Sequence, residues 1–345
     1  MINAAEIPTN NLTCSTFAAV QPISTPWHFI LNPAAAGGKG RLRWRKLLPR
    51  LRAAIPNMTF AISTDHTALG ALARDAVSLG KTHLVGVGGD GTHHHILNGL
   101  VASGKLSSVV YAPLALGSGN DWARSLGTPT DFTAWLAYLG NGRERTQLVG
   151  HIEFVKTGAV HYFLNVAGFA YDAEIVRIAR EERIRHQWMY PILALSYLSE
   201  YVAPTVLVSP QPGTGGASDS PELSRDDRAI PVHTINVGVG RYSGGGMQFV
   251  PHADLFGDRL ALTVAEKMPR WKVMANSWRF YAGSIGVVSG VTISHVDAVE
   301  LIPTAGTLEC EADGEWLGKG PVVISRCAER LRVLTKVEGI LPELP

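Results

Sequence analysis

The sequence predicts an N-terminal doubly wound α/β domain followed by a β-rich, sandwich-like C-terminal domain. Between Trp27 and Leu126, short apolar runs alternate with helical patterns, which is typical of parallel sheets covered by helices. After about residue 148 short strand patterns with turn signals dominate. We expect a loose tail at 1–25, a first domain at 26–148, a second at 149–320, and a C-terminal segment, 321–345, that returns toward the first domain.

The net charge, the cysteines and the hydrophobic pattern exclude several classes of protein. The 345 residues carry a formal net charge of +2, which argues against a strongly basic nucleic-acid binder, so we expect no nucleic-acid partner. Three scattered cysteines, Cys14, Cys310 and Cys327, form no disulfide framework or CxxC pair. No secretory signal or membrane-spanning stretch is recognised. We therefore expect a cytoplasmic protein that contacts a membrane only from its inner face, if its substrate is a lipid.

The first half contains four strand candidates, each followed by a small-residue loop or a helical pattern. The strands are expected at 28–31, 58–62, 83–87 and 109–112, and the helices at 41–54, 68–79, 94–102 and 122–126. Ligands of such domains bind in loops at the carboxyl ends of the strands. Three of these loops are rich in glycine and small polar residues.

The second half has seven strand candidates and two helical regions. The strands are expected at 151–155, 162–166, 234–238, 260–264, 298–302, 307–312 and 322–324, and the helices within 173–203 and 270–285. The stretch from 209 to 228 is dense in Pro, Gly, Ser and Asp, which predicts a surface loop.

The first glycine-rich loop follows the first strand and precedes a helix. Its residues are Asn32, Pro33, Ala34, Ala35, Ala36, Gly37, Gly38, Lys39 and Gly40. Backbone amides in such a loop can accept phosphate oxygens, with the helix N-terminus behind them. The loop lacks the ending of a Walker P-loop, and taken alone it is equally well explained as a plain strand-to-helix turn.

The second and third loops are more specific. Gly88-Gly89-Asp90-Gly91-Thr92 lets the backbone approach a nucleotide closely, while Asp90 can bind Mg²⁺ and Thr92 can donate to a phosphate. An Asp-Gly turn without a ligand is the alternative. The third loop, Gly117-Ser118-Gly119-Asn120-Asp121, stands at the start of a helix.

The order and spacing of these loops resemble the diacylglycerol kinase family, which includes sphingosine, ceramide and bacterial lipid kinases. The resemblance continues through 163–169 and Gly244-Gly245-Gly246-Met247, and ends at Asp313-Gly314-Glu315, so it covers roughly residues 27–335. It implies ATP and Mg²⁺ as cofactors, and a lipid hydroxyl as the acceptor in a cleft between two domains. The second loop also resembles the NAD kinase motif.

The resemblance implies a nucleotide site built from all three loops. Expected contacts are Asn32, Pro33, Ala34, Ala35, Ala36, Gly37, Thr64, Gly88, Gly89, Asp90, Gly91, Thr92, Ser118, Asn120 and Asp121. Ser118 stands where the family usually has Thr, which keeps the hydroxyl. Thr64 rests on a looser match, and a strand-end residue without a ligand is the alternative.

The resemblance also implies a catalytic carboxylate at Asp313 or Glu315. A kinase needs a group that accepts the proton of the attacking hydroxyl. The residue pattern alone leaves both as candidates, and the alternating 308–313 segment also predicts a hairpin that simply turns at Asp313-Gly314. A structural Mg²⁺ site of bacterial members matches Leu255, Asp258 and Leu260, with a surface turn as the alternative.

The main departure from the family lies in His93-His94-His95. His95 stands where the family usually has an acidic residue, so metal preference and activity stay open. Three adjacent imidazoles also suggest zinc. On a helix they point about 100° apart, which disfavours a common ion.

A basic amphipathic stretch in the second half is a candidate for membrane contact. It carries Arg177, Arg180, Arg183 and Arg185 together with Ile178, Ile184, Trp188, Met189, Tyr190 and Ile192. Anionic lipid would attract such a helix, and an ordinary surface helix is the alternative.

Two other functions remain open at this point. The chain could be an NAD kinase-like enzyme, or a catalytically silent relative that binds lipid or nucleotide. The sequence identifies neither the lipid acceptor nor the oligomeric state, and a homodimer is possible.

Overall fold

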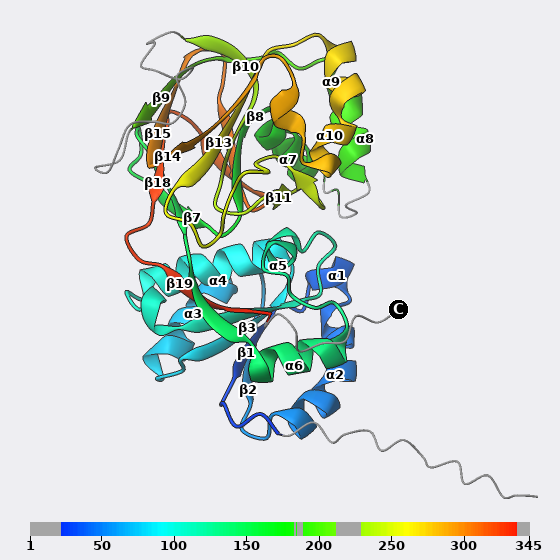
Figure 1. The fold of residues 1–345 in the computed structure, drawn as a ribbon. Coiled ribbons are helices and arrows are strands. Elements are labelled where there is room, and N and C mark those ends of the chain that lie inside the picture. Colours follow the sequence, from blue (N-terminus) through cyan, green and yellow to red (C-terminus); the bar gives the residue numbers. More distant parts are fainter. Residues whose placement is uncertain (1–21, 183, 185–188, 212–228, 337–345) are drawn as a thin grey trace, which may run out of the picture.

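A computed structural model describes residues 22–182, 184, 189–211 and 229–336, which form two domains stacked end to end (Figure 1). The expected tail before residue 22, most of the loop at 209–228, and the side chains of Arg183, Arg185, Trp188, Met189 and Tyr190 lie outside the described residues. The described end of the tail is not loose. Ile23 is buried in the core of the first domain, and its amide donates to the Ala54 carbonyl.

The first domain is a six-stranded sheet in the order β2-β1-β3-β4-β19-β5. Its strands are β1 (His28–Leu31), β2 (Thr59–Ile62), β3 (His83–Gly88), β4 (Val110–Ala115), β5 (Arg143–Gln147) and β19 (Leu331–Thr335). All neighbours pair in parallel except β19 and β5, which pair antiparallel. The expected parallel α/β sheet is confirmed.

Helices cover both faces of this sheet because its apolar residues alternate between them. Its helices are α1 (Ala35–Gly38), α2 (Gly40–Ala54), α3 (Ala68–Ser78), α4 (Asp90–Ala102), α5 (Asp121–Ser125) and α6 (Phe132–Asn141). Phe29 and Leu31 belong to the core beneath α2 and α6. Ile30, between them, belongs to the core beneath α3 and α4.

The second domain is an eleven-stranded antiparallel sheet with helices on one side. Its strands are β6 (Gly150–Phe154), β7 (Val160–Phe163), β8 (Val166–Ala170), β9 (Thr205–Gln211), β10 (Ile230–Gly238), β13 (Leu260–Glu266), β14 (Val291–Val296), β15 (Ala298–Ala305), β16 (Glu309–Ala312), β17 (Glu315–Lys319) and β18 (Val322–Arg326). A small hairpin, β11 (Tyr242–Ser243) and β12 (Met247–Gln248), stands apart from it. The expected β-rich domain is confirmed.

The helices of the second domain gather at one edge, at the upper right of Figure 1. They are α7 (Tyr171–Glu181), α8 (Met189–Tyr197), α9 (Arg270–Asn276) and α10 (Trp278–Ala282). The helical pattern expected at 173–203 is therefore two helices, and the second ends at Tyr197 rather than at residue 203. No helix among the described residues is long and apolar enough to cross a membrane.

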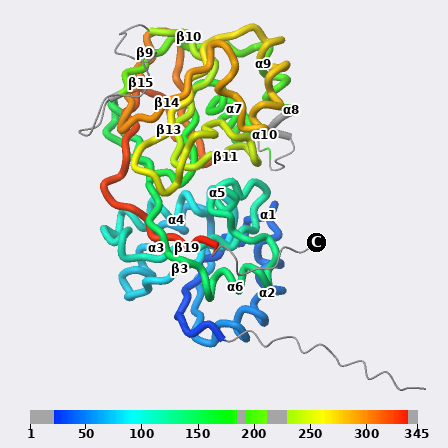
Figure 2. The backbone as a smooth tube through the Cα atoms, viewed as in Figure 1, coloured from blue at the N-terminus to red at the C-terminus, as the bar shows by residue number. Residues whose placement is uncertain are grey.

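Two chain segments cross between the domains on the same side, seen as the green and red tubes of Figure 2. One joins β5 to β6, and the other joins β18 to β19. The Cys327 amide of the second crossing donates to the Val149 carbonyl of the first, so the crossings support each other. The return to the first domain begins after Arg326, since β18 still pairs with β6.

Candidate active site

The three glycine-rich loops meet at the carboxyl edge of the first sheet. The Asn32 side chain donates to the Thr92 hydroxyl at 2.9 Å, which joins the first loop to the second. Its Oδ1 also accepts the Ala34 amide, which shapes the first loop. The backbone of that loop is left-handed at Ala36 and Gly37, so it is a turn rather than a regular helix. A parallel sheet brings loops far apart in sequence to one edge.

Glycines bring the second and third loops into direct contact. A Cβ atom added to Gly117 would lie 2.5 Å from the Gly89 Cα, a distance that real side chains do not reach. Asn120 adopts the left-handed conformation and donates to the Gly117 carbonyl. Its Oδ1 is buried with no hydrogen-bond partner among the described residues.

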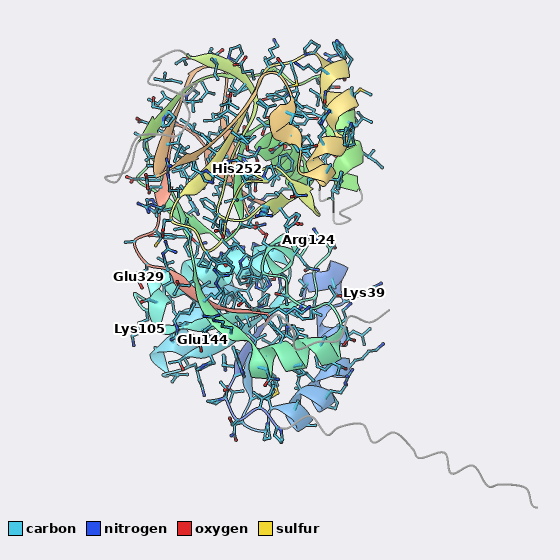
Figure 3. The ribbon with its side chains drawn as sticks, viewed as in Figure 1. Lys39, Lys105, Arg124, Glu144, His252 and Glu329 are labelled. Atoms are coloured by element: carbon cyan, nitrogen blue, oxygen red, sulfur yellow. The ribbon has the colours of Figure 1, made fainter. Side chains whose placement is uncertain are left out.

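Two carboxylates lie at the junction of these loops. Asp90 begins α4, and its Oδ1 accepts the Trp122 amide at 3.1 Å. Burial, and then repulsion by Asp121, raises the pKa of Asp90 to about 7. The Asp121 carboxylate accepts one hydrogen bond from the Arg124 guanidinium and another from the Gly245 amide, each at 2.6 Å. The third loop is thereby tied to the β11–β12 hairpin of the second domain, and Arg124 lies where the two domains face each other (Figure 3).

Asp313 projects into this junction from the second domain. It sits in the turn between β16 and β17, where both Asp313 and Gly314 have positive φ angles. The predicted hairpin turn is therefore present, and the turn also presents a carboxylate to the cleft. Asp313 accepts the amides of Leu164 and Asn165 at 2.9 Å each, and its Oδ2 lies 3.3 Å from His94 Nδ1. Both oxygens of Asp313 are thus already engaged.

Glu315 approaches the second loop from the same hairpin. A Cβ atom added to Gly91 would lie 2.2 Å from Glu315 Oε1, so only glycine admits the carboxylate there. No described residue makes a hydrogen bond or ion pair with the Glu315 side chain. Of the two predicted catalytic carboxylates, one is fixed by protein donors and the other is free.

The three histidines have different contacts. His93 is buried against Tyr111, with 2.7 Å between Nδ1 and the phenol oxygen. His94, not His95, contacts Asp313 in the β16–β17 turn. His95 packs near His66, and burial lowers its pKa to about 4, so it is neutral at physiological pH. No cluster of three or more His, Cys, Asp or Glu side chains within 22–182, 184, 189–211 and 229–336 could hold a metal ion alone.

One cavity of about 670 Å³ joins the glycine-rich loops to the helices of the second domain. Its polar end is lined by Asp90, Gly91, Ser118, Asp121 and Asp313. Its other end is mainly apolar and is lined by α7, α8, α9 and α10 through Ile175, Val176, Ala194, Leu195, Leu198, Val273, Met274 and Phe280. We call this apolar end the chamber. Its size and lining are those of a site for an apolar ligand.

Two buried carboxylates near the chamber were not expected from the sequence. Asp172 accepts the Thr234 hydroxyl at 2.6 Å, and burial raises its pKa to about 6. Glu311 accepts the Gly314 amide, and burial raises its pKa well above the usual range. Both line the cavity. In the alternating sequence Glu311 shares the polar face with Glu309 and Asp313, opposite Cys310 and Ala312, so hydrophobic periodicity predicted an exposed side chain rather than a buried one.

Two residues of the expected Mg²⁺ site at Leu255, Asp258 and Leu260 make hydrogen bonds within the protein. The Asp258 carboxylate accepts Arg330 at 2.5 Å, and its carbonyl accepts Arg326 at 2.5 Å. The Leu255 carbonyl accepts the Leu148 amide. Guanidinium and amide groups thus already engage the Asp258 carboxylate and the Leu255 carbonyl, and Mg²⁺ at this position stays a prediction.

Thr64 also lies apart from the other predicted contacts. It is exposed after β2, and its hydroxyl donates to Asp65 at 3.0 Å. Asp65 in turn accepts the amides of Thr67 and Ala68 at the start of α3. The hydrogen bond of Thr64 to Asp65 therefore belongs to the turn that begins α3.

Sequence comparison identifies both domains. The diacylglycerol kinase catalytic domain matches residues 26–152, and the YegS C-terminal NAD kinase beta sandwich-like domain matches residues 165–335. The chain belongs to the diacylglycerol kinase catalytic domain family. It is a lipid kinase, and therefore a phosphotransferase. Its second domain is of the YegS type.

Individual relatives of the family agree with both matches. "Putative lipid kinase YtlR" of Bacillus subtilis (strain 168) is 23% identical over 320 residues, which is 90% of this chain and 99% of that protein. "Probable lipid kinase YegS-like" of Pseudomonas syringae pv. tomato is 25% identical over 71% of this chain and 73% of that protein. A solved structure described as a diacylglycerol kinase from Bacillus anthracis str. Sterne has a TM-score of 0.62 at 17% identity, covers 90% of this chain and 97% of that one, and shows the same fold.

Proposed function

We propose that this lipid kinase transfers the γ-phosphoryl group of ATP to a lipid hydroxyl in the cleft between its two domains. The observation that carries the proposal is the single cavity with two chemically different ends. Phosphate-binding loops form one end, and the apolar chamber forms the other. An acceptor whose hydroxyl lies near Asp313 would extend its acyl chain into the chamber.

The first domain supplies the nucleotide end. Gly91, Ser118 and Gly119 of the second and third loops line the cavity where the phosphates would lie, and their backbone amides and the Ser118 hydroxyl are the proposed donors. The proposed contacts in the first loop are Asn32 to Gly37. Thr64 is left out because its hydroxyl is engaged in a helix start.

The residues at this end fit Mg²⁺ brought by the nucleotide. Asp90 and Asp121 are close enough for mutual repulsion to raise the pKa of Asp90, and a cation between carboxylate and phosphates would relieve that repulsion. Mg²⁺ usually takes only one or two carboxylates, with phosphates and waters completing the shell. When bound, the ion would neutralise phosphate charge during transfer. Asp90 is the proposed protein ligand.

Glu315 is the proposed general base, and Asp313 is the proposed positioning residue. A base must have a lone pair free to accept the proton of the attacking hydroxyl. Asp313 already accepts two backbone amides and faces His94, whereas Glu315 has no partner among the described residues. Asp313 thereby holds the loop of Leu164 and Asn165 in place and orients the end of the cavity.

The experiment that tests the proposal is phosphate transfer from γ-labelled ATP with Mg²⁺ in mixed micelles. Each assay contains one acceptor: diacylglycerol, a sphingoid base, ceramide, monoacylglycerol, phosphatidylglycerol, or NAD. Asp90→Asn is the test variant, and Asp75→Asn, an exposed carboxylate on α3, is its matched control.

We expect label in one lipid class, lost in Asp90→Asn and kept in Asp75→Asn. Label in NAD would instead indicate an NAD kinase-like enzyme. ATP binding without transfer to any acceptor would indicate a catalytically silent relative and contradict the proposal.

A further inference from the structure

An exposed apolar surface surrounds the mouth of the chamber. Six large side chains form it: Ile192 and Leu195 on α8, and Trp271, Met274, Trp278 and Tyr281 on α9 and α10. Each is between 53% and 69% exposed. We call these six residues the rim patch. Apolar side chains so exposed and so close together are unusual on a protein that has no partner.

The α9–α10 part of the rim patch is one face of a nearly continuous helix. Ser277, between the two helices, keeps helical angles of φ −58° and ψ −33°. Positions 271, 274, 278 and 281 therefore share one face, at the spacing of an amphipathic helix. Val273, Ser277 and Phe280 lie on another face and line the chamber.

Three members of the rim patch belong to the surface and to the chamber at the same time. Leu195, Met274 and Tyr281 are all exposed, and all line the cavity. The chamber therefore opens within the rim patch, between α8 on one side and α9–α10 on the other. A ligand entering there passes from an apolar surface directly into an apolar cavity.

The charges of the α9–α10 segment are of one sign. Residues 267–282 include Lys267, Arg270, Lys272 and Arg279 and no acidic residue. Lys272 donates to the Ser289 carbonyl at 2.7 Å, and Arg279 lies 4.6 Å from the centre of the Trp278 ring. Neither interaction neutralises the charge. Basic residues beside exposed tryptophans are complementary to a bilayer with anionic headgroups.

We propose that the rim patch inserts into an anionic lipid bilayer, so that the chamber opens toward the acyl chains and the acceptor enters without crossing water. This inference rests on the proposed function and adds the surface through which the acceptor arrives. The charge of the α9–α10 segment and the continuity of the patch with the chamber favour a bilayer over a second copy of the chain, which would bring like charges together.

The rim patch shares Ile192 with the basic stretch that the sequence suggested, but the α7 arginines of that stretch lie elsewhere. Arg177 of α7 pairs with Glu174 at 2.5 Å and with Glu181 at 2.8 Å. The Arg180 guanidinium lies over the Trp316 ring. These two arginines contact their own domain, so they are not the basic groups of the proposed surface.

The test uses the full chain and sedimentation with vesicles of phosphatidylcholine containing a quarter phosphatidylglycerol. The variant is Trp271→Ala/Trp278→Ala, since neither tryptophan lines the cavity. The matched control is Leu42→Ala/Leu79→Ala, two exposed leucines of the first domain. Phosphate transfer to a short-chain, water-dispersed acceptor is measured in parallel.

We expect the tryptophan variant to bind vesicles about ten-fold more weakly, because less apolar area and fewer interfacial rings are buried in the bilayer. Binding by the leucine control should stay unchanged. Vesicles of phosphatidylcholine alone should bind the wild type more weakly than the mixed vesicles do. Transfer to the short-chain acceptor should be equal in all three proteins.

Vesicle binding by the tryptophan variant at the wild-type level would overturn the proposal. A wild-type dimer that the tryptophan variant converts to monomers, without change in vesicle binding, would overturn it in favour of a second copy. Vesicle binding that depends on the tryptophans, without transfer to any lipid, would support the surface and contradict the proposed kinase activity.

Discussion

The two domains present opposite kinds of surface to the same cavity. The first domain contributes loops, backbone amides and carboxylates at the edge of a parallel sheet. The second contributes helix faces of apolar side chains, together with the hairpin that carries Asp313 and Glu315. Under the proposed function, nucleotide binding and acceptor binding are therefore separable in this chain. Substitutions on one side should therefore leave the other side's binding constant unchanged.

The largest effect is expected at the hairpin, where the two sides meet. Glu315→Gln should lower kcat about 10²- to 10⁴-fold, because the proposed base is removed, without a change in melting temperature. Asp313→Asn should lower both kcat and the melting temperature. Its amide group can accept from only one of the Leu164 and Asn165 amides, and a buried donor left unpaired costs about 1–3 kcal/mol. Steady-state rates and thermal melts measure the two effects.

The reverse pattern would exchange the proposed roles of these carboxylates. A Glu315→Gln protein that keeps its rate, beside an inactive but stable Asp313→Asn, would identify Asp313 as the base.

A first-domain substitution should act on the nucleotide alone. Asn32→Ala removes the bond to Thr92 and the acceptor for the Ala34 amide. We expect the KM for ATP to rise about ten-fold, since two weak hydrogen bonds shape the loop. The KM for the lipid should stay constant. The matched control is Asn276→Ala in the second domain, which should leave the KM for ATP unchanged. An equal rise in both KM values would show that the two sides are not separable.

Asp172→Asn should stabilise the protein at neutral pH. Burial raises the pKa of Asp172 from 3.8 to about 6, so the folded state holds the proton while the unfolded chain releases it. Stability of the wild type therefore falls as pH rises from about 4 to about 6, by about 3 kcal/mol at most, and does not recover above that range. The variant loses this dependence. Chemical unfolding between pH 4 and 8 measures it, with the exposed Asp75→Asn as control. A variant that keeps the wild-type slope would contradict the assignment.

The first-domain site was predictable because its parts are contiguous in sequence. Each phosphate loop follows a strand, and a parallel sheet necessarily places those loops at one edge. Contacts such as Asn32 with Thr92, or Gly89 with Gly117, follow from that topology. The α/β sheet and the β-rich second domain were predicted by periodicity alone.

The second-domain chamber was not predictable from local pattern. Its walls come from α7, α8 and α9–α10, and no motif relates Leu195 to Met274. Whether an Arg faces lipid or a neighbouring Glu, as Arg177 does, depends on packing. Likewise, only the three-dimensional structure shows that Arg330 pairs with Asp258, and that His94 rather than His95 contacts Asp313.

The smallest effect is expected at the crossing between the domains. Because Arg326 and Arg330 engage Asp258, removal of divalent cations with EDTA should leave the melting temperature of the nucleotide-free protein unchanged. The Asp258 side chain is 85% exposed, so Arg330→Met should cost only about 0–1 kcal/mol of folding stability. A Mg²⁺-dependent rise in melting temperature, kept in Asp90→Asn and lost in Asp258→Ala, would indicate a metal site at Asp258.

Whether the acceptor occupies the chamber is tested most simply by filling the chamber and measuring phosphate transfer. Ala194→Trp places a large ring in the chamber, and Ala53→Trp on the exposed face of α2 is its matched control. We expect Ala194→Trp to bind ATP as the wild type does but to transfer little phosphate to a long-chain lipid, while the control transfers normally. Transfer by Ala194→Trp at the wild-type rate would show that the acceptor does not occupy the chamber, and would contradict the account.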